Sequence, residues 1–126
     1  MSKHYRIVPY LTVRGGVDAI KFYEDAFDAE EVSRMMADDG KRVMHAELEI
    51  NDSPLMLSDD FAESGVGAPT EIRATTVTIH LDFKKPKHVD EIIHQAMAAG
   101  AELVMAPQDV FWGARYGKVR DPFGHV

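Results

Sequence analysis

The chain has 126 residues, 45% of them hydrophobic and 28% charged, and this composition predicts one folded domain with an ordinary buried core. Its 21 acidic and 14 basic side chains give a formal net charge of −7, which argues against a nucleic-acid surface and a polybasic membrane patch. The absence of cysteine excludes disulfides, a thiolate nucleophile and a cysteine-based zinc site.

The N-terminal half begins with a predicted strand and helix. Residues 1–6 are too polar for a signal peptide, and no apolar run approaches the roughly 20 residues that span a bilayer, so we expect a cytoplasmic protein with no membrane partner. Residues 6–13 have the pattern of a strand, which Gly15 and Gly16 end. From Val17 onward apolar residues recur at helical spacing, which predicts a helix packed on a sheet through Ala19, Ile20, Phe22, Tyr23, Ala26 and Phe27.

Three further strands are predicted before residue 60. Residues 31–37 lead into a hairpin at residues 38–40, where Asp-Asp-Gly tolerates a left-handed turn. Residues 43–50 alternate most clearly, with Met44, Ala46, Leu48 and Ile50 on one face and His45, Glu47 and Glu49 on the other. Residues 54–58 form the last predicted strand of this half.

The second half restarts the same order of elements. After a linker at about residues 61–74, residues 75–83 alternate as a strand, and residues 88–99 form a helix capped by Gly100. A strand and a hairpin then lead to the turn at residues 121–124, where proline fixes φ and glycine supplies a positive φ. Two residues follow this turn, so we expect the final strand to be truncated.

An internal repeat relates the two halves. Residues 29–32 align with residues 101–104 at an offset of 72, and the two helices align at the same offset. Each half therefore follows the order strand, helix and three strands. We predict a single α+β domain, residues 1–126, built from two βαβββ modules at about residues 5–60 and 75–126. The modules would form a curved, partly closed mixed sheet around a cleft.

Strand parity predicts which side chains line this cleft. Each half-sheet has one face covered by its helix and one polar face, and the two polar faces together would line the cleft. The predicted lining consists of Val8, Tyr10, His45, Glu47, Glu49, Thr78, His80, Trp112, Tyr116 and Lys118. Of these, Tyr10, His45 and Thr78 are candidate ligand-binding residues. Arg115 faces away from the cleft by parity, and we expect it to hold the hairpin together.

Five other residues of this lining suggest chemistry or ligand binding. Glu47 is the candidate general base, because desolvation in an enclosed cleft would raise the pKa of a carboxylate; a solvated strand carboxylate is the alternative. His80 is the candidate acid–base partner, although a lone histidine on a strand more often satisfies a neighbouring group. Trp112 and Tyr116 would form an aromatic wall for a ligand, and Lys118 would bind an anion.

Several motifs of the chain resemble one known family. They are Ile20-Lys21-Phe22-Tyr23, Met44-His45-Ala46-Glu47-Leu48, Arg115-Tyr116-Gly117 and Asp121-Pro122-Phe123-Gly124-His125. They look like the vicinal oxygen chelate superfamily of glyoxalases, bleomycin resistance proteins and dioxygenases, and more narrowly like its PhnB-like branch. The resemblance implies a glyoxalase-like fold, commonly a homodimer, with a divalent metal in the cleft of the enzymatic branches. The family usually has glycine after the first helix, and we expect Asp28 to adopt the left-handed conformation there.

The metal ligands that this resemblance implies are incomplete in the chain. They fall on Val8, Glu47, Thr78 and a position beyond Val126, and of these Glu47 alone is a good ligand for a divalent metal. We therefore predict no metal cofactor. A displaced site of His45, Glu47 and His80 is the alternative.

The first functional hypothesis is a small-molecule-binding protein, homodimeric and without a metal in its cleft, whose ligand and reaction the sequence does not name. The rival is a glyoxalase-like, divalent-metal-dependent lyase, isomerase or dioxygenase that uses Glu47 with His45 or His80. A third reading is an interaction module whose cleft is filled by side chains.

Overall fold

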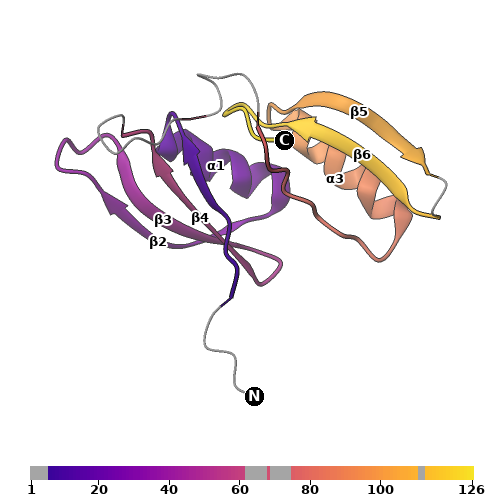
Figure 1. Cartoon of the computed structure of the whole chain (residues 1–126), viewed down its shortest axis with the longest axis horizontal. Coiled ribbons are helices and arrows are strands. Elements are labelled where there is room, and N and C mark those ends of the chain that lie inside the picture. Colours follow the sequence, from indigo (N-terminus) through magenta and orange to yellow (C-terminus); the bar gives the residue numbers. More distant parts are fainter. Residues whose placement is uncertain (1–5, 62–67, 69–74, 111–112) are drawn as a thin grey trace, which may run out of the picture.

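The computed structural model describes residues 6–61, 68, 75–110 and 113–126, which form two sheets, each with a helix against one face (Figure 1). This is the α+β architecture predicted from the sequence. In chain order the elements are β1 Tyr10–Val13, α1 Gly16–Phe27, β2 Glu30–Met36, β3 Val43–Ile50, β4 Ser53–Asp59, α3 Pro86–Ala98, β5 Glu102–Asp109 and β6 Arg115–Arg120. Neither helix is long and apolar enough to cross a membrane.

The first sheet contains four strands in the order β1-β4-β3-β2. β1 runs parallel to β4, with Tyr10 opposite Met56, and the other neighbours are antiparallel. Helix α1 packs on the face that Ala46 and Leu48 occupy, as the alternation of β3 predicts for these two residues. Met44, predicted for the same face, is exposed, and Val43 is buried instead. The stripe predicted for the helix is confirmed: Ala19, Ile20, Phe22, Tyr23 and Ala26 are all buried.

The start of α1 is held by a buried carboxylate from the end of β4. Asp59 accepts hydrogen bonds from the backbone N–H groups of Gly15 at 2.8 Å, Gly16 at 3.0 Å and Val43 at 2.7 Å. A negative charge suits a helix N-terminus, whose first N–H groups lack partners within the helix. Gly16 is required here, because a Cβ atom would lie 2.6 Å from the Asp59 carboxylate and 2.8 Å from the Val43 side chain.

The end of α1 confirms the expectation for Asp28. Its φ of 58° and ψ of 34° are left-handed, and its backbone N–H donates to the Tyr23 carbonyl. Aspartate tolerates this conformation better than most residues, so the helix ends where the family usually has glycine.

The second sheet consists of the antiparallel strands β5 and β6, with α3 against one face. Its register repeats that of the first half: Met105 pairs with Lys118, as Ser33 pairs with Glu47, and Met105 follows Ser33 by 72 positions. Lys118 is therefore the positional equivalent of Glu47. Gly117 faces α3, since a Cβ there would lie 2.4 Å from Ile93 Cδ1, and its neighbours point to the other face.

The strand predicted for residues 75–83 does not form among the described residues, and this part of the prediction is wrong. In the first sheet β1 pairs with β4, which lies between β1 and β3. The equivalent position in the second half lies between residues 75–83 and β6. Among the described residues at that position, the carbonyl oxygen of Val126 accepts a hydrogen bond from the backbone N–H of Ile79, with N and O 3.2 Å apart. An alternating pattern marks a strand's two faces, but a strand forms only where a partner supplies hydrogen bonds.

The two halves meet through their helices and the turn after β6, and their sheets stay separate where one partly closed sheet was expected. Gln95 of α3 donates to the Ala26 carbonyl at 3.2 Å and to Asp28 Oδ1 at 3.2 Å. Phe123 is buried against Phe22 and Tyr23. The turn therefore closes the core between the halves, close to the marked C-terminus in Figure 1.

Candidate functional site

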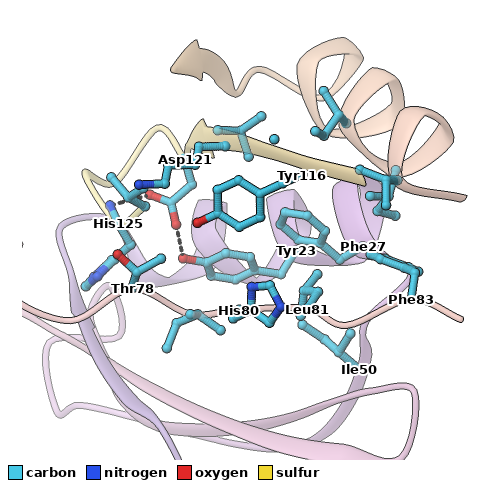
Figure 2. A pocket seen from close by; sticks show the side chains of 18 of the residues that line it. Tyr23, Phe27, Ile50, Thr78, His80, Leu81, Phe83, Tyr116, Asp121 and His125 are labelled. Atoms are coloured by element: carbon cyan, nitrogen blue, oxygen red, sulfur yellow. Dashed lines mark hydrogen bonds between the residues drawn. The ribbon is translucent and has the colours of Figure 1, made fainter. Parts of the chain in front are cut away.

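A groove of about 150 Å³ opens between the two halves. Strand β6, residues 78–83 and α3 form its sides, and side chains from the core of the first half form its floor (Figure 2). Most of this lining is apolar and includes Leu11, Phe27, Ile50, Leu55, Leu81, Phe83, Val89 and Ile92. An apolar concavity with a few polar groups is the usual form of a small-molecule site.

Four of the predicted site residues lie together in this groove: Thr78, His80, Tyr116 and Lys118. The ring of His80 stacks on that of Tyr116, with centroids 6.1 Å apart and planes at 23°. Lys118 Nζ lies 5.8 Å from the centroid of Tyr116, within the range of a cation–π interaction. The stacked pair of His80 and Tyr116, both labelled in Figure 2, brings β6 and residues 78–83 onto one site.

Three other predicted residues lie elsewhere, on the polar face of the first sheet. The Tyr10 hydroxyl and His45 Nδ1 are 2.8 Å apart, and their rings are tilted at 59°. Glu47 lies on the same face of β3 as His45, and its cross-strand neighbour is Met56 of β4. None of the three lines the groove. Trp112 lies outside the described residues.

The structure adds a buried pair that the sequence analysis assigned to folding alone. The Tyr23 hydroxyl donates a hydrogen bond to Asp121 Oδ2 at the edge of the groove (Figure 2). Asp121 Oδ1 accepts from the backbone N–H groups of Phe123 and His125, both at 2.9 Å. The sequence feature that could have indicated this pair is a tyrosine within the apolar stripe of a helix, because a buried hydroxyl needs a hydrogen-bond partner.

The surroundings of Tyr23 keep its hydroxyl protonated. Burial is the main cause, and the charge of Asp121 and the hydrogen bond to it act in the same direction, so the pKa of Tyr23 is raised well above its usual 10.0. A phenol held in this way is a fixed donor to Asp121 and does not act as a general base.

Arg115 is among the residues that line the groove, so the expectation that it faces away is wrong, and its guanidinium binds three acceptors. Its Nε lies 3.0 Å from Asp90 of α3, Nη1 lies 3.1 Å from Asp109 of β5, and Nη2 donates to the Pro107 carbonyl at 3.3 Å. These hydrogen bonds and charges raise the pKa of Arg115. The expectation that Arg115 holds the hairpin together is thus confirmed, and the contact with Asp90 also ties the hairpin to its helix.

The residues present do not fit the metal site that the resemblance implies. Within residues 6–61, 68, 75–110 and 113–126, no three His, Asp or Glu side chains are grouped closely enough to hold a metal ion. The alternative set of His45, Glu47 and His80 therefore forms no such group. Val8 and Thr78 occupy two of the implied ligand positions, and valine has no donor atom.

The profile of the Glyoxalase/Bleomycin resistance protein/Dioxygenase superfamily matches residues 4–126. The chain belongs to this superfamily. An uncharacterized protein of Mycobacterium bovis is 45% identical over 120 residues, which cover 93% of this chain and 76% of that protein. Superfamily membership confirms the resemblance noted in the sequence.

Solved structures of other proteins share the fold. A gene product from Arabidopsis thaliana is 27% identical, with a TM-score of 0.75, over 98% of this chain and 95% of its own. The PhnB protein from Bacillus cereus, titled a putative 3-demethylubiquinone-9 3-methyltransferase, is 21% identical, with a TM-score of 0.67, over 96% of this chain and 95% of its own. These likenesses support the glyoxalase-like architecture and do not name a ligand.

Proposed function

We propose that this superfamily member binds a small organic molecule in the groove between its halves, and that binding needs no metal ion. The observation that carries the proposal is the groove itself, in which Thr78, His80, Tyr116 and Lys118 meet within mainly apolar walls. Burial of apolar ligand surface would supply most of the binding free energy, and the few polar groups would orient the ligand.

The proposal assigns no reaction, because the candidate acid–base residues are divided between two places. His80 lies in the groove, whereas Glu47 lies on the polar face of the first sheet with Tyr10 and His45. A general acid and a general base must both reach the reacting atoms of one ligand, within about 3 Å or through one water. Ligand binding is therefore better supported than acid–base catalysis by Glu47 and His80 together.

A thermal-shift screen with a panel of small molecules tests the proposal. The protein is purified without a histidine tag and treated with a chelator before the screen. We expect at least one class of molecule to raise the melting temperature reproducibly, because a ligand that binds only the folded state stabilises it. Tyr116→Ser should abolish the shift, and Tyr10→Phe, on the other sheet, should retain it.

The rival metalloenzyme predicts the opposite pattern. Metal analysis would find stoichiometric zinc, nickel, manganese or iron that is lost in Glu47→Gln, and ligand shifts would disappear on chelation and return with the metal. That result, or a screen in which no molecule raises the melting temperature, would contradict the proposal.

A further inference from the structure

The charged groups that line the groove differ in whether they already have partners. Asp121 is the carboxylate among the described lining residues, and the Tyr23 hydroxyl and two backbone N–H groups occupy both of its oxygens. The Arg115 guanidinium is bound by Asp90 and Asp109. His125 Nε2 lies 2.8 Å from the Thr12 carbonyl oxygen. These three charged or titratable groups are therefore already bonded within the fold.

Lys118 and His80 are different. Within the described parts of the chain, the Lys118 ammonium has no carboxylate at salt-bridge distance, and it lies near the ring of Tyr116. The ring of His80 stacks on the same ring, and neither of its nitrogens has a hydrogen-bond partner among the described residues. Two nitrogen donors therefore border one aromatic ring in a groove whose carboxylate is already satisfied.

The charge of the whole protein makes this local arrangement informative. With a formal net charge of −7, the protein as a whole repels anions, so an anionic ligand would gain little from long-range attraction. Recognition of an acid would depend on short-range hydrogen bonds from Lys118 and His80. Such bonds are stronger beside apolar surface than in bulk water, and most of the side chains that line this groove are apolar.

We propose that the ligand of the groove is an organic carboxylate with a flat apolar body. Lys118 and His80 bind its carboxylate, and Tyr116 together with the apolar walls contacts its body. This assignment rests on the proposed function, because it names the chemical class of the molecule that binds the same groove.

A matched pair of probes tests the assignment: 2-naphthoate and 2-naphthamide, which share a flat body and differ in the charge of the head group. Isothermal titration calorimetry of each probe with the wild-type protein should show about tenfold tighter binding of the carboxylate, the range expected for a charge-assisted hydrogen bond. Lys118→Met, which retains the length and loses the charge, should remove the preference. Lys118→Arg should retain it, and Glu47→Gln on the other sheet should leave it unchanged.

The outcomes separate this assignment from the proposed function. Equal affinities for the two probes, or an unchanged preference in a folded Lys118→Met protein, would overturn the carboxylate assignment while ligand binding in the groove stands. If neither probe binds at millimolar concentration, the assignment is overturned as well, and the proposed function falls only if the small-molecule screen also finds no ligand. Circular dichroism melting of each variant without probe verifies that it is folded.

Discussion

The two halves of the molecule share one predicted order of elements, but the described residues of the second half form fewer paired strands than those of the first. In the first half four paired strands cover α1, which buries six of its residues. In the second half two paired strands cover α3, which buries Ile93 and Ala96. The difference shows that local patterns suffice to form a helix and a hairpin, whereas a closed core requires every strand to have its neighbour.

The groove lies where the two halves face one another. It opens between residues 78–83, β6 and α3 of the second half, and side chains of the first half, among them Leu11, Phe27 and Ile50, complete its lining. The comparison of halves therefore predicts a stable first half and a second half whose exposed surfaces are available to a ligand.

The largest expected effect comes from Asp59, which joins three parts of the first half. Asp59→Ala leaves the backbone N–H groups of Gly15, Gly16 and Val43 without their acceptor in a buried place. Unsatisfied buried donors cost roughly 1–3 kcal/mol each, so the free energy of unfolding should fall by about 3 kcal/mol or more. Urea denaturation measures this change. Asp59→Asn keeps an acceptor oxygen and should lose less unfolding free energy. A loss below about 1 kcal/mol in Asp59→Ala would contradict the role of Asp59 as the acceptor that holds these three segments together.

A second pair of variants compares the two cores directly. Leu48 of β3 is fully buried, and Leu48→Ala should cost about 3 kcal/mol of unfolding free energy, because it leaves a cavity in a packed core. Ile93 of α3 is 8% exposed and lines the open groove, so Ile93→Ala should cost roughly 1–2 kcal/mol less than Leu48→Ala. Both values come from chemical denaturation. Equal losses would mean that the second core is packed as closely as the first.

The smallest expected effect concerns the contact that joins the halves. Tyr23→Phe removes the hydroxyl bond to Asp121 and should cost about 1 kcal/mol near neutral pH. Because the pKa of Tyr23 is raised in the folded state, the folded protein holds this proton more tightly than the unfolded chain does. The contribution is therefore complete below the unfolded value of 10.0 and is lost as pH rises above it.

Unfolding curves measured between pH 9 and pH 11 test this sign. The wild type should lose stability over that interval more steeply than Tyr23→Phe, which has no phenol at this position. Parallel curves for the two proteins would show that the Tyr23 hydroxyl is not held by Asp121 in the folded state.

For the candidate site, too, the sequence predicted what depends on neighbouring residues and missed what depends on how distant segments pack. The alternation of β6 placed Tyr116 and Lys118 on one face of that strand. Alternation did not decide which residues line the groove, because side chains of both parities do so: Ile79 and Leu81 lie there beside Thr78 and His80. The sequence did not show that Tyr10, His45 and Glu47 lie on another surface, because parity assigns a face within a sheet but not the position of one sheet relative to another.

The sequence by itself determined what depends on near neighbours along the chain. The stripe of α1, the alternation of β3, the left-handed Asp28 and the turn at Asp121 follow from side-chain spacing and from backbone freedom over a few residues. Tertiary structure alone decided that residues 75–83 form no strand, that Tyr23 binds Asp121 and that His80 stacks on Tyr116. Each of these needs a partner that the chain brings close only by folding, and no local pattern encodes such a partner.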